Sequence, residues 1–141
     1  GSSHSPSVAV LSADAVAQAM LASTVLNFSA INADQRAFYV RSGQADYRGT
    51  TFSMPAISVG GRFRIAVDAT AKRVWFGSAS GWNGDPENGT GGGDMSTFSS
   101  AFFIGFAGWN TTNSPDTVSL KANAEDFTHS IPNGFAPYGV I

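Results

Sequence analysis

RFRIAVDATAKRVWFGSASGWNGDPENGT, which spans Arg62 to Thr90, contains the pattern that determines the fold class of this chain. Phe63, Ile65 and Val67 alternate with polar or small residues, which predicts a strand with one buried face. The segment DATAK then supplies a tight turn, and VWF resumes the sheet. A long polar loop rich in Trp, Asn, Gly and Asp follows, and a loop held by a rigid β scaffold is a common place for recognition.

The rest of the chain continues the β pattern. AFFIGFAGW, from Ala101 to Trp109, is nearly continuous apolar sequence and predicts a central strand that is buried on both faces. Two prolines exclude a central strand between Ile131 and Tyr138, so this tail is expected along an edge. Seven or eight short strands separated by turn signals predict an antiparallel β-sandwich. The other predicted strands are Ser7–Leu11, Ala37–Arg41, Ala45–Thr51, Thr117–Asn123 and Phe127–His129.

One short helix is expected directly after the first strand. Ser12 is a suitable N-cap, and Asp14 would face the positive end of the helix dipole. The apolar residues that follow recur at helical spacing, which indicates an amphipathic helix that covers one edge of the sheet. They are Ala13, Val16, Ala17, Met20 and Leu21.

Length and composition limit the classes of protein to which the chain belongs. Its 141 residues suit a single domain, and a hydrophobic content of 43% suits a globular one. Eight Lys and Arg residues are scattered along a chain of net charge −2, so nucleic acid is not an expected partner. The absence of cysteine excludes disulfides and thiolate metal sites. Membrane insertion is not expected, because no apolar run approaches the roughly 18–20 residues of a spanning helix.

The ordered set of motifs resembles the SPRY domain in its bacteriophage and prophage form. The motifs are RIAVD, VWFG and GWNGDP with its glycine-rich continuation, then VSLK and the tail IPNGF. The resemblance covers nearly all of residues 1–141 as a single SPRY-like domain and is strongest from Phe63 to Tyr138. It implies a concanavalin-like, jelly-roll β-sandwich. The chain has no counterpart of the family's first strands, which implies that the domain is incomplete at its N-terminus.

The phage-like form of the motifs implies a virion or extracellular protein. The expected role is a non-enzymatic recognition or structural module of a tail fibre, tailspike or decoration protein. Its expected partner is a host-surface glycan or another subunit of the virion, and a homo-oligomer is compatible with this role. A purely structural packing module and a carbohydrate-active enzyme domain are the alternatives.

Aromatic and amide side chains near the predicted strand ends are the candidate binding residues. Trp82 and Trp109 are placed to stack on a sugar or on an apolar side chain of a partner, and neighbouring polar groups would supply hydrogen bonds. The neighbouring polar residues are Asn83, Asp85, Asn88 and Asn110, and Tyr47 with Arg48 forms a second candidate pair. Trp75 is expected in the core.

Neither catalysis nor a cofactor is predicted. Asp85, Glu87 and Asp94 share one glycine-rich loop, where solvated turns are a better interpretation than a catalytic pair held at fixed separation. His4 and His129 are far apart in the sequence, with no nucleophile pattern nearby. GTGGGD is followed by no Lys and therefore does not match a phosphate-binding loop. Oxygen ligands between Asn83 and Asn88 do not match a calcium-loop spacing, so no metal is expected.

Overall fold

The computed structural model describes residues 7–14, 37–41, 44–47, 50–53, 61–99, 101–107 and 119–138. This part of the chain consists mostly of strands in antiparallel sheets, with one short 3-10 helix, η1 (Ala124–Asp126). That architecture is consistent with the predicted all-β class. The predicted helix after Ser12 lies mainly outside the described residues.

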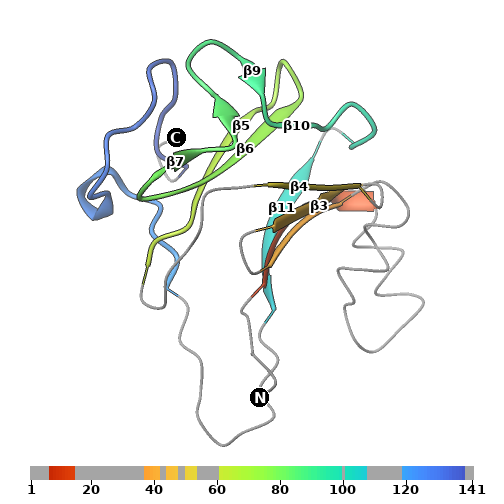
Figure 1. The fold of residues 1–141 in the computed structure, drawn as a ribbon, viewed down its shortest axis with the longest axis horizontal. Coiled ribbons are helices and arrows are strands. Elements are labelled where there is room, and N and C mark those ends of the chain that lie inside the picture. The colour runs from red at the N-terminus through yellow and green to blue at the C-terminus, as the bar shows by residue number, and fades with distance from the viewer. Residues whose placement is uncertain are drawn as a thin grey trace, which may run out of the picture.

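The strands form two main sheets and one small hairpin (Figure 1). Sheet A has the order β11-β1-β2-β3-β4, and its strands are β1 (Ser7–Ser12), β2 (Ala37–Arg41), β3 (Gln44–Tyr47), β4 (Thr50–Ser53) and β11 (Phe102–Ala107). In sheet B, β6 pairs with β5 along one side and with β7 and β10 along the other, and its strands are β5 (Arg64–Asp68), β6 (Arg73–Ser78), β7 (Gly81–Trp82) and β10 (Gly93–Asp94). The small hairpin pairs β8 (Gly84–Asp85) with β9 (Thr90–Gly91).

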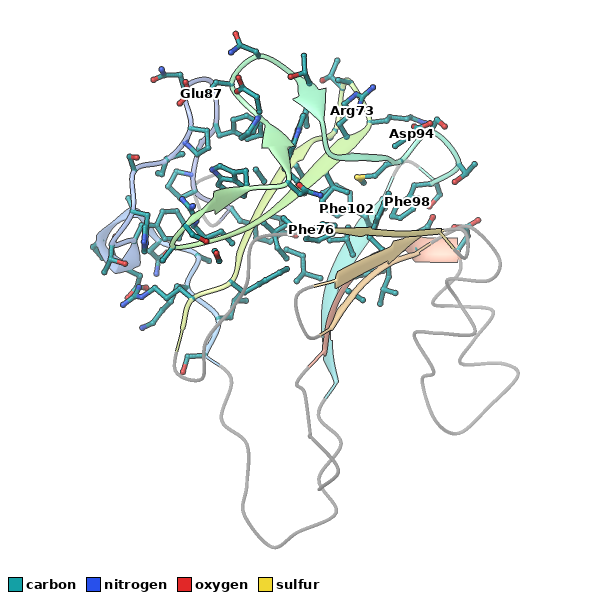
Figure 2. The ribbon with its side chains drawn as sticks, viewed as in Figure 1. Arg73, Phe76, Glu87, Asp94, Phe98 and Phe102 are labelled. Atoms are coloured by element: carbon teal, nitrogen blue, oxygen red, sulfur yellow. The ribbon has the colours of Figure 1, made fainter. Side chains whose placement is uncertain are left out.

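Aromatic side chains from both main sheets meet in one hydrophobic core. Phe38 of sheet A and Phe76 of sheet B are fully buried, and their ring centroids are 5.9 Å apart. Phe98, from the segment between β10 and β11, lies 5.9 Å from the Phe38 ring. Figure 2 shows Phe76, Phe98 and Phe102 gathered between the two sheets. The core therefore joins sheet A to sheet B by direct side-chain packing.

The hairpin between β5 and β6 confirms the opening sequence pattern. Asp68 and Arg73 are cross-strand partners, so residues 69–72 form the connection. The Asp68 carboxylate accepts hydrogen bonds from Thr70 N (2.9 Å) and Ala71 N (2.8 Å), which closes the turn. Ile65 and Val67 pack against the core, as their alternation predicted.

β11 is not the central strand that its apolar sequence predicted. Among the described strands it pairs with β1 alone and lies at the end of sheet A, and Phe103 is 54% exposed. β1, of less uniform composition, is an inner strand and pairs with both β11 and β2. Within this apolar run, Phe102 packs against the core, whereas the next residue, Phe103, is exposed. The run therefore does not mark a strand that is buried on both faces.

Three further predictions about strands are also wrong. The described residues 119–123 and 127–129 are not strands, and η1 lies between them. Instead of one strand over Ala45–Thr51, the structure has β3 and β4, which pair with each other as a hairpin. The described tail residues 131–138 form no strand, and the Phe135 ring contacts the Trp75 ring of β6.

Candidate functional site

The candidate site is the face of sheet B that is turned away from sheet A. Because side chains alternate along a strand, Phe76 enters the core while its neighbours Trp75 and Gly77 occupy the opposite face. Arg64 is the cross-strand partner of Gly77 and shares that face. The β8–β9 hairpin and the C-terminal segment lie on the same side of the sheet (Figure 1).

Arg64, Gly77 and Trp82 form a row across three adjacent strands. Gly77 is paired with Arg64 of β5 on one side and with Trp82 of β7 on the other. A Cβ atom on Gly77 would lie 2.8 Å from Cε3 of Trp82, so the missing side chain is what lets the indole lie over the strand. The guanidinium carbon of Arg64 is 4.5 Å from the centre of the Trp82 ring, within the range of a cation–π contact.

Backbone carbonyls fix the orientation of the Arg64 side chain. Its Nη2 donates to the carbonyl oxygens of Ser78 and Gly81, both in or beside the β6–β7 turn. Partial burial of the guanidinium lowers the pKa of Arg64. The row is thus a preordered cationic and aromatic surface in which the Trp82 ring is half-buried.

Asn83 hydrogen-bonds to the backbone of β6, so its side-chain oxygen is not available to a ligand. Its Oδ1 accepts a hydrogen bond from Phe76 N (2.8 Å), and its own N–H donates to Phe76 O (2.9 Å). The Asn83 side chain therefore takes the place of a backbone acceptor from a neighbouring strand beside Phe76, directly after the end of β7. Its Nδ2 is buried without a hydrogen-bond partner in the described structure.

Asp85 and Asn88 close the turn between β8 and β9. The Asp85 carboxylate accepts from the backbone N–H of Asn88 (3.2 Å) and from its side-chain Nδ2 (2.7 Å). These hydrogen bonds, from the Asn88 side chain first and its backbone second, lower the pKa of Asp85. Asp94 also closes a turn, because its Oδ1 accepts a hydrogen bond from Ser96 N at 2.8 Å. Asp85 and Asp94 thus have the turn-forming geometry that the sequence favoured.

Replacing Asp85 with alanine is expected to destabilise the chain at neutral pH and to lose this effect in acid. A carboxylate whose pKa is lower in the folded state contributes stability above its unfolded pKa of about 3.9. That contribution disappears as the pH falls through the lowered pKa of the folded state. Thermal unfolding of wild type and Asp85→Ala between neutral and acid pH measures the difference, and a difference that persists in acid would contradict it. Glu125→Ala, an exposed carboxylate in η1, is the control.

A second cluster fixes the C-terminal segment over the same face. Trp75 is fully buried, and its Nε1 donates to Thr90 O at 2.9 Å. Phe135 meets the Trp75 ring edge-on, with the centroids 5.9 Å apart. Glu87 accepts hydrogen bonds from the backbone N (3.0 Å) and the side-chain Nδ2 (3.4 Å) of Asn133. Figure 2 shows Glu87 beside the tail, so its carboxylate joins the β8–β9 turn to the C-terminal segment.

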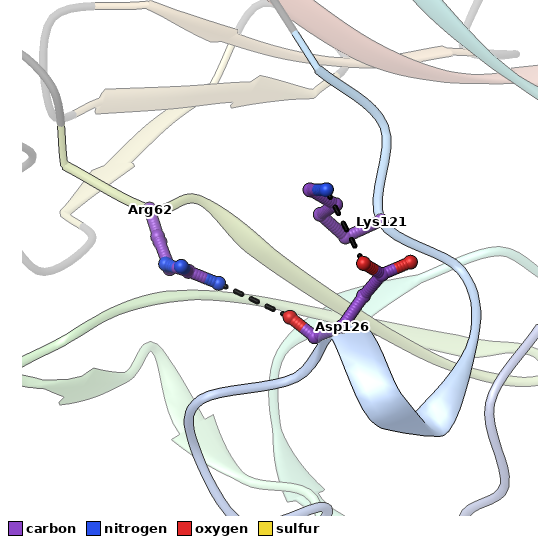
Figure 3. Close-up of polar contacts among 3 residues, drawn as sticks. All are labelled: Arg62, Lys121 and Asp126. Carbon is purple, nitrogen blue, oxygen red and sulfur yellow. Dashed lines mark hydrogen bonds and ion pairs between the residues drawn. The ribbon is translucent and has the colours of Figure 1, made fainter.

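A third contact joins the beginning of sheet B to η1 (Figure 3). Arg62 donates through Nη1 to the Asp126 carbonyl oxygen (3.2 Å), and Lys121 forms an ion pair with the Asp126 carboxylate at 3.2 Å. The carbonyl of Asp126 thus joins the segment to the residues before β5, whereas its carboxylate forms an ion pair within the segment. Because this pair is exposed, it contributes little to stability.

The structure brings together a part of the predicted binding set. Trp82, Asn83, Asp85 and Asn88 lie in the consecutive strands β7 and β8 and in the turns that follow them. Trp109, Asn110 and Arg48 lie outside the described residues, and Tyr47 is described as the last residue of β3. Sequence analysis missed Arg64, Gly77 and Asn133. The alternation of Phe63, Ile65 and Val67 implies that Arg64 lies on the opposite face of its strand. The sequence does not show that Gly77 pairs with both Arg64 and Trp82.

Comparison with protein-family models, with curated proteins and with solved structures finds no match to this chain. Among the described residues, no helix has the length and apolar character that a membrane span requires. Within the same residues, no group of three or more His, Asp and Glu side chains is arranged to hold a metal ion.

Proposed function

We propose that the chain is a SPRY-type β-sandwich that serves as a non-enzymatic recognition module of a bacteriophage virion. The order of RIAVD, VWFG and GWNGDP along β5, β6 and β7 supports the family assignment. The shared core of sheets A and B supports a sandwich, because two sheets that pack face to face contribute inward-pointing side chains to one interior. The virion assignment rests on the resemblance.

The row of Arg64, Gly77 and Trp82 is the observation that supports recognition of a protein partner. Trp and Arg are the residue types that most often dominate the binding energy of protein interfaces. Here the Arg64 and Trp82 side chains are already held by neighbouring atoms, so binding would cost little additional side-chain entropy. Another virion subunit is therefore the proposed partner, and it would contact the outer face of sheet B beside β7.

A host-surface glycan is the second candidate ligand. The half-buried ring of Trp82 offers a surface on which a sugar can stack. Glycan binding also needs convergent polar groups, yet Asn83 bonds to β6, and Asp85 and Asn88 bond to each other. These internal hydrogen bonds favour the protein partner over the glycan.

The proposed absence of catalysis rests on the roles of the loop carboxylates. Asp85 closes its own turn with Asn88, whereas Glu87 reaches across to Asn133 of the tail. A carbohydrate-active site needs two carboxylates that flank one bond at a defined separation. Both acids are committed to structural hydrogen bonds instead.

Substitution of Trp82 is expected to reduce incorporation of the chain into virions. A tagged variant and untagged wild type would be produced together during particle assembly, and their ratio in purified particles compared with that in the lysate. Loss of a hot-spot contact of about 2 kcal/mol lowers that ratio about 30-fold. Arg64→Ala is expected to reduce it in the same direction, whereas Tyr138→Ala, an aromatic residue that is 69% exposed, serves as the matched control.

Three outcomes separate the candidates. Absence of the wild-type chain from particles overturns the virion assignment. Equal incorporation of folded Trp82→Ala and wild type overturns the proposed contact face. Binding of the wild-type chain to a glycan array, lost in Trp82→Ala, replaces the protein partner with a glycan.

A further inference from the structure

Three asparagines in the described part of the chain are followed directly by glycine: Asn83–Gly84, Asn88–Gly89 and Asn133–Gly134. In such a pair the backbone nitrogen of glycine can attack the side-chain amide carbon of the asparagine, because glycine has no Cβ to hinder the approach. The reaction needs freedom of the asparagine side chain and of the glycine N–H. The three sites differ in both respects.

The first two pairs are restrained by hydrogen bonds. The Asn83 amide oxygen is held by Phe76 N at 2.8 Å, and Gly84 is paired with Gly91 in the β8–β9 hairpin. The Asn88 amide donates to the Asp85 carboxylate at 2.7 Å, and Gly89 N donates to Pro86 O at 3.2 Å. Reaction at either site requires the hairpin to open first.

The third pair has the fewest restraints. Asn133 and Gly134 are both exposed, and the one side-chain hydrogen bond of Asn133, to Glu87 Oε2, is 3.4 Å long. Gly134 has φ +85°, and a Cβ built on it would meet no heavy atom within 4 Å. Within the described structure, the only backbone hydrogen bond across this turn runs from Phe135 N to Pro132 O (3.1 Å), so the N–H of Gly134 is not used.

We propose that Asn133 is a site of spontaneous deamidation that detaches the C-terminal segment from the β8–β9 hairpin. Gly134 N forms a bond to Cγ of Asn133, the Cγ–Nδ2 bond breaks, and Nδ2 leaves as ammonia with the proton from Gly134 N. Water then opens the resulting cyclic imide at either carbonyl and yields aspartate or isoaspartate. The net reaction consumes one water, releases one ammonia and involves no oxidation.

The product reverses the side-chain contact, one of the two hydrogen bonds that Asn133 donates to Glu87. The amide that donates to Glu87 Oε2 becomes a second carboxylate, and two like charges within hydrogen-bonding distance repel each other. The isoaspartate form also lengthens the backbone within the Pro132–Phe135 turn. Phe135, which packs on Trp75, lies two residues from the modified position, so its contact is expected to weaken.

Ageing of the purified chain tests the site of modification. The protein is incubated in mildly alkaline buffer, digested, and mapped by mass spectrometry with separation of the aspartate and isoaspartate peptides. The Asn133 peptide is expected to convert severalfold faster than the Asn83 and Asn88 peptides of the same molecule. Conversion of Asn83 or Asn88 as fast as that of Asn133 overturns the assignment.

Genetic variants test the consequence. Asn133→Asp reproduces the charge, and the indole N–H of Trp75 reports on the tail through its chemical shift and its hydrogen exchange. Asn133→Asp is expected to accelerate this exchange, and Asn133→Gln, which keeps an amide, is the matched control. Glu87→Gln combined with Asn133→Asp removes the repulsion and is expected to restore protection. Exchange in Asn133→Asp equal to that in the wild type, or no recovery in the double variant, overturns the mechanism.

Discussion

Replacing Phe76 with alanine is expected to lower the free energy of unfolding by about 3–5 kcal/mol. Phe76 is fully buried, and its ring lies 5.9 Å from the Phe38 ring of sheet A and 5.8 Å from the Phe63 ring beside β5. Its removal leaves a cavity at the point where the two sheets meet. Since small domains are stable by about 5–15 kcal/mol in total, this single change removes a large part of the margin.

Denaturant unfolding measures the effect, with a lower midpoint at an unchanged slope as the expected result. Phe103→Ala is the matched control, because Phe103 is 54% exposed on β11 and is expected to change stability by less than about 1 kcal/mol. Similar losses for the two variants would show that the core does not hold sheets A and B together. A Phe76→Ala variant that is unfolded in buffer agrees with the expectation, and Phe76→Leu then supplies a smaller, measurable loss.

The sequence was most informative where one strand has one buried face. Phe63, Ile65 and Val67 pack on the core as their alternation predicted, and the DATAK turn lies where the two strands meet. It was misleading at β11, because a nearly uniform apolar run does not indicate whether a strand lies inside a sheet or at its end. Strand position depends on pairing between distant segments, such as β1 with β11, and no local pattern encodes it.

For the candidate site, the sequence pointed to the loop after β6 but did not show the hydrogen bonds that several of its side chains make within the chain. Of the candidates Trp82, Asn83, Asp85 and Asn88, the last three hydrogen-bond within the chain. Glu87 was considered as a loop carboxylate, and the structure shows that it binds Asn133, far away in the sequence. The contact of Arg64 with Trp82 depends on the missing side chain of Gly77, which becomes apparent only once strands β5, β6 and β7 are aligned.

The second large effect is expected from Gly92→Ala, which should destabilise the chain by about 2–5 kcal/mol through two additive causes. Gly92 has φ +69°, a left-handed conformation that costs residues with a Cβ about 1–2 kcal/mol. Its Cβ would also lie 2.6 Å from Val74 O and 2.7 Å from the Trp75 ring. Val74 and Trp75 are fully buried in β6, so neither group can move aside without disturbing the sheet.

Gly89→Ala separates the two causes. Gly89 has nearly the same backbone conformation, φ +66°, but a Cβ there meets no heavy atom within 4 Å. Gly89→Ala is therefore expected to show the conformational cost alone, about 1–2 kcal/mol, and the excess loss in Gly92→Ala measures the steric contact with β6. Trp75 provides an independent readout, because displacing its ring breaks the hydrogen bond from its Nε1 to Thr90 O and exposes the indole N–H to exchange. Equal losses in the two variants would mean that the β9–β10 connection does not pack on Trp75. The C-terminal segment alone would then cover Trp75 on the outer face of sheet B.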